Sequence, residues 1–356
     1  MFGVRGEIRY RQIEPIGVGE GMNSHVFRAY DPYLEREIAV KEIAKSKLGN
    51  SFDDYCAEAR SMFVVAHPNI VGVEFVCETP DLISIALPYF ANGSLKRKIQ
   101  HNPLNLRKFL KTAQGILVGL QRIHSGNFLH LDLKPSNILL DDTEKPLIAD
   151  FGQSRQMSPG GTVAYPAGYR WVMPPEVWSS SVATVESDIY QVGVLLYRAA
   201  NGDVPYSAQK TAITSNDELR RQVLRGRFPD PKLFLPHVPP GVRRIIRKAM
   251  RVEPSERYRS ASDFAAALGR VRLQLDWTTT SLGKGAYNWR TDRVDKRNLE
   301  VELSESASST WQTRVWTTNG AGRRRRNVAD YWVDRLGYEA AWRHLTEVFV
   351  DLGQQG

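Results

Sequence analysis

The chain has 356 residues, of which 42% are hydrophobic, 24% are charged and 10% are aromatic. This balance is typical of a globular protein and excludes a disordered tail, a collagen-like repeat and a coiled coil. The formal net charge of +9 favours acidic partners such as nucleotides or nucleic acid. No stretch of about 18 apolar residues is present, the first ten residues lack the apolar segment of a secretory signal, and two cysteines cannot build a disulfide framework. We therefore expect a soluble, cytoplasmic protein without a membrane span.

The periodicity of the chain predicts a strand-rich first part and a helix-rich second part. Short apolar stretches separated by Gly, Pro or Asp predict strands at residues 8–16, 24–30, 37–43 and 82–90. Apolar residues at helical spacing predict one helix at about 52–66 and mostly helical structure over 94–125 and 183–270. This division favours two lobes of different class with a cleft between them.

Residues 271–356 have a different character, because six of the eight tryptophans lie there. Strands are predicted at 298–304 and 310–318, followed by helices at about 327–336 and 338–352. Disordered tails are poor in aromatic residues. The segment is therefore predicted to be a small folded α+β unit, with the tryptophans in its core rather than stacked on nucleic-acid bases.

A glycine-rich segment and a lysine in a strand suggest a phosphate-binding element. Residues 19–26 follow G-x-G-x-x-(G/S)-x-V, a pattern that lets backbone N–H groups approach phosphates, although an ordinary turn has a similar composition. Fifteen residues after Val26, Lys41 lies in an apolar strand, where a buried ammonium needs an anion. Glu58 on the predicted helix is the best candidate for its carboxylate partner; a solvent-exposed helix face is the alternative interpretation.

The most informative stretch is H-L-D-L-K-P-S-N at residues 130–137, with Asp150-Phe151-Gly152 beginning eighteen residues after Asp132. It combines a carboxylate, a cation at Lys134 and an amide at Asn137. Phosphoryl transfer needs these parts, namely a group that orients the hydroxyl, a cation against the γ-phosphate and oxygen ligands for Mg²⁺. The joint spacing is a far stronger signal than either motif alone.

Over residues 8–270 the chain resembles the eukaryotic-type protein kinases, in the form common among bacterial serine/threonine kinases. Beyond the motifs above, the resemblance runs through H-P-N-I-V at 67–71, P-P-E at 174–176, D-x-Y-x-x-G at 188–193, G-x-x-P-Y at 202–206 and P-S-E-R-Y at 254–258. It implies an α+β, bilobal kinase fold with a β-rich N-lobe at 8–91, a helical C-lobe at 92–270, and the small α+β unit at 271–356.

The resemblance also implies the roles of individual residues. Asp132 is expected to act as the base toward a substrate hydroxyl while Lys134 neutralises the moving phosphate. The implied catalytic residues are Asp132, Lys134, Lys41 and Glu58, and the implied Mg²⁺ ligands are Asn137 and Asp150. The implied ATP-binding residues are Val18, Gly19, Gly21, Val26, Ala39, Lys41, Pro88, Phe90 and Leu139.

Later motifs favour a protein substrate over a small molecule. Glu176 and Arg257 are expected to form a buried ion pair in the lobe that docks the substrate polypeptide. The stretch 130–137 corresponds to the catalytic loop of the family, and Asp188, near the start of an apolar helix, is expected to hold its backbone. Lys134 is typical of the serine/threonine class. The resemblance thus predicts transfer of the ATP γ-phosphate to Ser or Thr hydroxyls of proteins.

Two departures from the family pattern affect regulation and substrate choice. Leu131 replaces the usual arginine before Asp132, which removes the obvious receiver of a phosphate on residues 153–175. We therefore expect activity that does not require phosphorylation of that segment. Residues 168–173 also depart from G-T-x-x-Y-M: either the threonine that contacts the catalytic loop is missing, or a residue is inserted.

The arginine run at 323–326 leaves the role of the last segment open. It could bind nucleic acid or an acidic protein, but residues 271–356 hold thirteen Lys and Arg against eleven Asp and Glu, so a solvated turn is favoured. Three functions are compatible with the sequence: an active protein kinase whose C-terminal unit recruits a substrate or other partner protein or regulates the lobes, a nucleotide-binding pseudokinase, and a kinase whose C-terminal unit binds nucleic acid. The first is favoured because every charged catalytic position is present.

Overall fold

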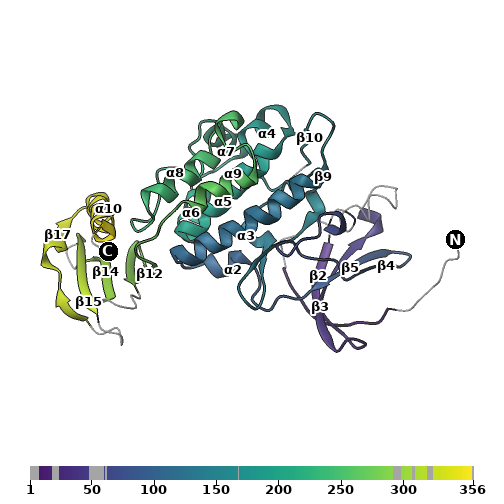
Figure 1. Ribbon diagram of the computed structural model, residues 1–356, viewed down its shortest axis with the longest axis horizontal. Helices are drawn as coiled ribbons and strands as arrows, with labels where there is room; N and C mark the ends of the chain where they lie inside the picture. Colours follow the sequence, from purple (N-terminus) through teal and green to yellow (C-terminus); the bar gives the residue numbers. More distant parts are fainter. Residues whose placement is uncertain are drawn as a thin grey trace.

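The computed structural model describes residues 8–17, 24–47, 60, 62–166, 168–291, 298–306, 309–318 and 324–354. Figure 1 shows a β-rich lobe at the N-terminal end, a helical lobe in the middle and a smaller sheet beside a helix at the C-terminal end. Among the described residues, no helix is long and apolar enough to cross a membrane.

The N-terminal lobe is built on a five-stranded antiparallel sheet. Its order is β1-β2-β3-β5-β4, formed by β1 (Arg11–Pro15), β2 (Ser24–Asp31), β3 (Arg36–Ala44), β4 (Phe75–Glu78) and β5 (Leu82–Pro88). Alternation along β3 buries Ile38 and Val40 on one face and places Lys41 on the other. The predicted strands are confirmed. The helix expected at 52–66 lies mostly outside the described residues, although residues 62–64 are helical.

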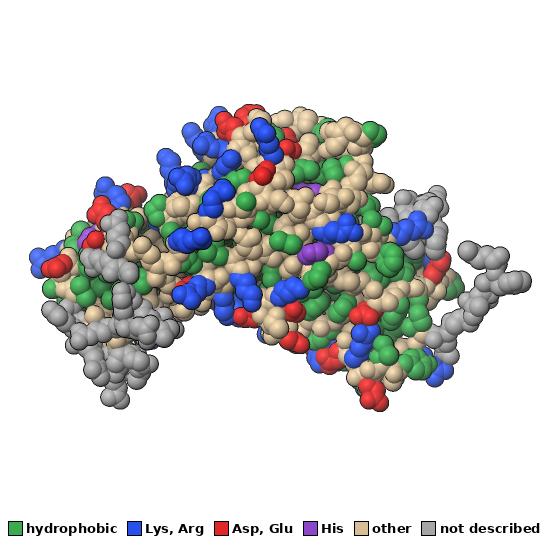
Figure 2. Space-filling model, in the orientation of Figure 1, with side chains coloured by type: hydrophobic (Ala, Val, Ile, Leu, Met, Phe, Trp, Pro, Cys, Tyr) green, Lys and Arg blue, Asp and Glu red, His purple; other side chains and the backbone are tan. Residues whose placement is uncertain are grey.

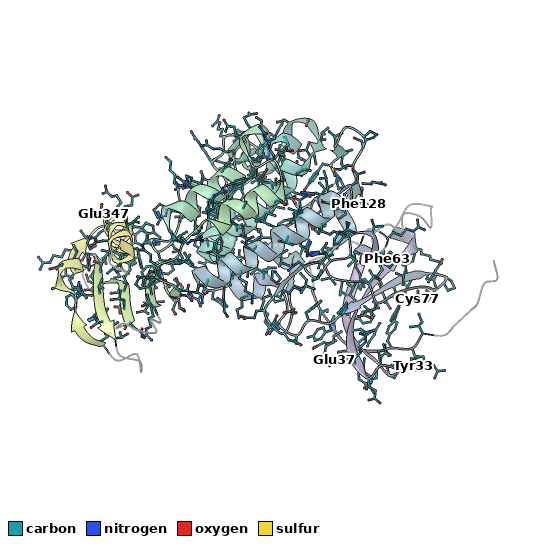
Figure 3. The ribbon with its side chains drawn as sticks, in the orientation of Figure 1. Tyr33, Glu37, Phe63, Cys77, Phe128 and Glu347 are labelled. Atoms are coloured by element: carbon teal, nitrogen blue, oxygen red, sulfur yellow. The ribbon has the colours of Figure 1, made fainter. Side chains whose placement is uncertain are left out.

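The structure describes one of the two cysteines. Cys77 lies on β4 as a free thiol (Figure 3), and Cys56 is outside the described residues.

The helical lobe packs amphipathic helices around the almost fully buried α5. Its helices are α2 (Leu95–Ile99), α3 (Leu106–Ser125), α4 (Pro175–Ser180), α5 (Val185–Asn201), α6 (Asp203–Thr211), α7 (Asn216–Leu224), α8 (Pro240–Ala249) and α9 (Ala261–Gly269). The predicted helical regions are therefore confirmed. On α8, Val242 and Ile246 are buried while Arg244, Arg247 and Lys248 are exposed, so its cations lie on the wet face. Lys and Arg side chains gather on this lobe in Figure 2.

Short strands hold the loops between α3 and α5. These strands are β6 (Phe128–Leu129), β7 (Ile138–Leu140), β8 (Pro146–Ile148), β9 (Arg155–Gln156), β10 (Val163–Ala164) and β11 (Val182–Ala183). They pair as β6-β9, β7-β8 and β10-β11. The pairing of β6 with β9 brings the start of the segment 153–175 against the residues that precede the catalytic loop.

The C-terminal unit is a six-stranded antiparallel sheet with one helix. It contains β12 (Trp277–Gly283), β13 (Ala286–Thr291), β14 (Asn298–Glu305), β15 (Trp311–Thr318), β16 (Arg324–Asn327), β17 (Val333–Leu336) and α10 (Tyr338–Gln354). The helix predicted at 327–336 is wrong, because Val333 pairs with Thr313 and Leu336 with Trp311 in β17. Hydrogen bonding to β15 thus overrides the local helical spacing. The helix predicted at 338–352 is confirmed.

The C-terminal unit shares a continuous apolar core with the helical lobe. At the junction, His237 Nδ1 accepts a hydrogen bond of 3.0 Å from Trp289 Nε1, and both residues are buried. Burial lowers the pKa of His237 to about 3, assisted by the nearby Arg243. The Phe349 ring meets Trp289 edge-on at 5.3 Å. The prediction that the tryptophans build this unit's core is confirmed at Trp277, Trp289 and Trp316.

Candidate active site

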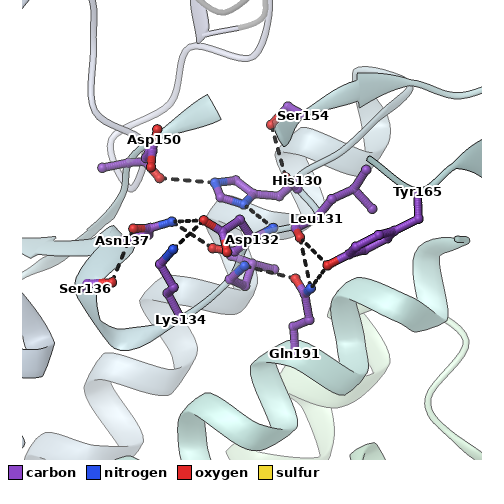
Figure 4. Close-up of polar contacts among 12 residues, drawn as sticks. His130, Leu131, Asp132, Lys134, Ser136, Asn137, Asp150, Ser154, Tyr165 and Gln191 are labelled. Carbon is purple, nitrogen blue, oxygen red and sulfur yellow. Dashed lines mark hydrogen bonds and ion pairs between the residues drawn. The ribbon is translucent and has the colours of Figure 1, made fainter. Parts of the chain in front are cut away.

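The catalytic loop brings a carboxylate, an ammonium and an amide into direct contact. Lys134 Nζ donates to Asp132 Oδ2 at 2.6 Å. Asn137 Nδ2 donates to the same oxygen at 2.9 Å and to the Asp132 backbone carbonyl at 2.8 Å. Figure 4 shows the side chains of Asp132, Lys134 and Asn137 converging on one another. Three residues predicted from one short motif thus form one cluster.

Asp132 is a buried carboxylate with one oxygen that lacks a donor within the described part of the chain. The residue is 5% exposed, and its Oδ1 is buried without a hydrogen-bond partner among the described residues. Burial raises the pKa of the Asp132 carboxyl above its ordinary value, although Lys134 opposes the shift. A buried acceptor oxygen without a donor is costly, so a substrate hydroxyl that donates to Oδ1 would relieve that cost.

Asp150 forms an ion pair with Lys41 of the N-terminal lobe. Lys41 Nζ lies 2.9 Å from Asp150 Oδ1, which links β3 to the loop after β8. Burial would raise the pKa of Asp150, but the Lys41 ammonium outweighs it and holds that pKa below its usual range. Asp150 is therefore ionised at neutral pH.

The donor set fits Mg²⁺. Because the Asn137 amino group is used on Asp132, the amide oxygen is available, with only a 3.4 Å contact from the Ser136 hydroxyl. The Asp150 carboxylate is 40% exposed and supplies ionised oxygen. Mg²⁺ prefers such oxygen ligands and is often held by one or two protein groups together with substrate phosphates. The described residues contain no cluster of three or more His, Cys, Asp or Glu side chains suited to a metal.

A buried histidine connects the catalytic loop to Asp150-Phe151-Gly152. His130 Nε2 donates to the Ala149 carbonyl at 3.1 Å, and His130 Nδ1 accepts from the Asp132 N–H at 3.3 Å. Its ring meets Phe151 edge-on at 5.0 Å. Burial lowers the pKa of His130, so the imidazole stays neutral and keeps this pair of bonds.

Two side chains of helix α5 form hydrogen bonds with the backbone of the catalytic loop. Asp188, as predicted, accepts from the backbone N–H of His130 at 2.9 Å and of Leu131 at 2.8 Å. Gln191 was not predicted as a site residue. Its amide donates to the Leu131 carbonyl and accepts from the Leu133 N–H, both at 2.9 Å, so it holds the backbone on either side of Asp132.

Leu131 is part of an apolar cluster rather than an exposed replacement for arginine. It is 1% exposed and has a positive φ of 66°. It clusters with Leu129, Val163, Val177 and Ala183. The Tyr165 hydroxyl donates to the Leu131 carbonyl at 3.0 Å and accepts from Gln191 Nε2 at 3.2 Å. The segment 153–175 is thus docked on the catalytic loop by apolar contacts and neutral hydrogen bonds.

The predicted ion pair between Glu176 and Arg257 is confirmed. Their bidentate contacts measure 2.7 and 2.9 Å, and the Arg257 side chain is fully buried. Arg257 also donates to three backbone carbonyls, those of Arg251, Val252 and Glu186. The pair ties α4 to the turn before α9.

The residues expected around the nucleotide lie at the junction of the lobes as far as the structure describes them. Val26 is opposite Lys41 in the β2–β3 register, and Ala39 lies two residues before Lys41, so all three share one face of the sheet. Leu139 lies on β7 in the helical lobe. The connection between the lobes contains Pro88, at the end of β5, and Phe90. Val18, Gly19, Gly21 and Glu58 lie outside the described residues.

One arginine of the 323–326 run, Arg324, forms ion pairs within the C-terminal unit. The Arg324 guanidinium bonds to the buried Glu300 at 2.9 Å and also pairs with Glu302. It stacks 3.5 Å from the centre of the Trp316 ring. Intramolecular pairing of this kind reduces the charge offered to a nucleic acid.

A β-rich lobe, a helical lobe and a cluster of Asp132, Lys134 and Asn137 beside a lysine-paired Asp150 are the parts that a kinase-type transfer of phosphate needs. The family model described as the protein kinase domain matches residues 10–266. The chain belongs to the protein kinase family.

Several curated relatives are bacterial serine/threonine kinases, which confirms the predicted resemblance. The serine/threonine-protein kinase PrkC of Bacillus subtilis is 30% identical over 273 residues, covering 75% of this chain and 41% of the relative. The DNA damage-responsive serine/threonine-protein kinase RqkA of Deinococcus radiodurans is 29% identical, covering 75% and 40%. The serine/threonine-protein kinase PknD of Chlamydia pneumoniae is 25% identical, covering 93% and 38%. The chain spans about two fifths of the length of these relatives.

Proposed function

We propose that this protein transfers the γ-phosphate of MgATP to Ser or Thr hydroxyls of protein substrates. The observation that carries the proposal is the contact between Asp132 and Lys134, beside an Asp150 that Lys41 holds ionised. The names of the bacterial relatives support the serine/threonine class. The Glu176–Arg257 pair supports a protein substrate, because the resemblance to protein kinases assigns this pair to the lobe that docks the substrate polypeptide.

In this reaction the substrate hydroxyl attacks the γ-phosphorus. The new O–P bond forms as the bond from phosphorus to the bridging oxygen breaks and ADP leaves. Asp132 Oδ1 orients the hydroxyl and accepts its proton, while Lys134 neutralises charge on the transferred phosphoryl group. Mg²⁺, held by Asn137 and Asp150, would neutralise phosphate charge when bound.

The nucleotide is proposed to lie between the lysine-bearing face of the N-terminal sheet and β7. Val26 and Ala39 would cover the adenine from above and Leu139 from below. Pro88 lacks an N–H but keeps its carbonyl, and Phe90 can supply the N–H. The proposed phosphate-binding residues are Val18, Gly19, Gly21 and Lys41, with Glu58 as a second partner of Lys41.

The C-terminal unit is proposed to contact a partner protein while it stays fixed on the helical lobe. Its shared core and the His237–Trp289 bond favour a rigid extension of the kinase. A role in nucleic-acid binding is less favoured because Arg324 is paired internally. We also propose that the protein acts in the cytoplasm, where MgATP is supplied.

The test is a transfer assay with γ-labelled ATP and Mg²⁺, using one basic and one acidic acceptor protein and identifying the labelled residue. Label on phosphoserine or phosphothreonine, lost in Asp132→Asn, is the expected result. Nucleotide binding without any transfer would instead identify a pseudokinase. Label confined to tyrosine would contradict the serine/threonine assignment.

A further inference from the structure

The lysine beside the proposed base and a second lysine on α6 both lie against the Tyr169 ring. Lys134 Nζ is 2.6 Å from Asp132 Oδ2 and 5.0 Å from the centre of the Tyr169 ring. Lys210 Nζ donates to the Tyr169 hydroxyl at 3.2 Å and lies 5.8 Å from the same ring centre. It is also 4.9 Å from the centre of the Trp171 ring. We call Tyr169, Trp171 and Lys210 the acceptor shelf.

Two members of the acceptor shelf, Tyr169 and Trp171, lie in the segment 168–173, which departs from the G-T-x-x-Y-M pattern of the kinase family. Tyr169 follows Gly168 in the segment 168–173, and its ring, rather than a hydroxyl on a short side chain, faces Lys134. The Tyr169 ring lies between Lys134, which contacts Asp132, and Lys210 on α6.

One side of the acceptor shelf packs against buried residues, and the other side is exposed to solvent. The buried Tyr206 donates its hydroxyl to the Trp171 carbonyl at 2.8 Å. The Trp171 ring lies 5.6 Å from that of the buried Phe228. Tyr169 is nevertheless 37% exposed. A rigid, accessible surface next to the base must meet whatever residues flank the acceptor hydroxyl.

The charge of the acceptor shelf is positive. Within the part of the chain that the structure describes, no carboxylate lies within ion-pairing distance of Lys210. The acidic side chains of α4, α6 and α7 with printed contacts are engaged elsewhere: Glu176 pairs with Arg257, Asp203 with Arg198, and Glu218 accepts from Thr214. Asp217 is exposed on α7, next to the Asn216 that Arg170 contacts.

We propose that the acceptor shelf selects Ser or Thr residues that are flanked by Asp or Glu. This inference rests on the proposed kinase activity. An acceptor hydroxyl that reaches Asp132 places its neighbouring residues over Tyr169, within reach of Lys210. A flanking carboxylate there gains a favourable interaction with the ammonium, and a flanking Lys or Arg is repelled.

The test compares serine peptides that differ only in their flanking residues. Three peptides carry Ala, Asp or Lys at the two positions on each side of the serine, and further versions carry Asp on one side only. We expect kcat/KM to be about fivefold higher for the Asp peptide than for the Ala peptide, as one partly exposed ion pair allows. That ratio should fall as ionic strength rises.

Variants of Lys210 identify the source of the preference. Lys210→Ala should bring the Asp-to-Ala ratio close to one, and Lys210→Glu should make the Lys peptide the better substrate. Lys210→Met keeps the apolar stem over the Trp171 ring and serves if the other variants fold poorly. Lys111→Ala, which removes an exposed lysine from α3, is the matched control and should keep the wild-type ratio.

The possible results are distinguishable. Equal use of the three peptides, or preference for the Lys peptide, overturns the inference while leaving the kinase activity intact. A wild-type ratio in Lys210→Ala overturns it as well, because the preference would then come from elsewhere. No transfer to any peptide by the unmodified protein overturns the proposed function, and this inference with it.

Discussion

Replacing Glu176 by Gln should destabilise the helical lobe strongly. The substitution keeps the shape of the side chain but removes the charge opposite Arg257, whose side chain is fully buried. Arg257 cannot lose its proton and cannot reach water, so an uncompensated charge stays in the core. Breaking a buried pair in this way costs about 3–5 kcal/mol of unfolding free energy.

The assay is thermal and urea-induced unfolding of the full chain. For a cooperative unit of roughly 150–250 residues, such a loss lowers Tm by about 6–20 °C. The urea midpoint should fall with little change in m, because the surface exposed on unfolding stays the same. A cycle with Arg257→Met should show a coupling energy above about 1.5 kcal/mol, since removing both charges leaves no buried ion.

A matched control is present in the same region. Arg251 Nε and Glu256 Oε2 are 3.9 Å apart, and their side chains are 63% and 57% exposed. Glu256→Gln should therefore cost less than about 0.5 kcal/mol. If Glu176→Gln melts as close to the wild type as this control does, the buried pair does not stabilise the lobe and the reasoning is refuted.

Three further predictions concern the loop, the junction and regulation. Gln191→Leu should lower kcat by about tenfold with a smaller change in KM for ATP, because the substitution removes the hydrogen bonds that hold the backbone on both sides of Asp132. Equal effects on kcat and on KM would contradict a positioning role for Gln191. Between pH 7.5 and 5.5, His237 becomes protonated in the unfolded chain but stays neutral in the folded protein, so the free energy of unfolding should fall by about 1.4 kcal/mol because of this residue. In urea titrations, His237→Gln should lose this part of the pH dependence of the unfolding free energy. The same pH dependence in the variant as in the wild type would argue against this role of His237. Phosphatase-treated enzyme should keep more than about half of its kcat, because Leu131 provides no charge to receive a phosphate; complete loss of activity would overturn this prediction.

The parts of the site that a short motif defines could be predicted from the sequence. The spacing of Asp132, Lys134 and Asn137 predicts their contact because one tight loop contains all three. The resemblance to protein kinases extends this to Asp188 and to the Glu176–Arg257 pair, which lie far apart along the chain. Their contacts are confirmed.

Contacts between neutral groups on distant elements could not be predicted. Gln191 and Tyr165 meet the Leu131 carbonyl from two different elements, and no charge or spacing links them in the sequence. The one signal was a glutamine within the apolar pattern of α5, since a buried amide needs partners. Likewise, the helix expected at 327–336 is wrong because β17 pairs with β15, a contact that local periodicity does not report.

The central claim is that Asp132 accepts the proton of a substrate hydroxyl in a site that binds MgATP. Its most direct test measures single-turnover phosphate transfer and ATP affinity for the wild type and for Asp132→Asn. Loss of a general base predicts a rate lower by about 10²–10⁴, with ATP affinity changed less than about threefold. Transfer at the wild-type rate by Asp132→Asn would contradict the account.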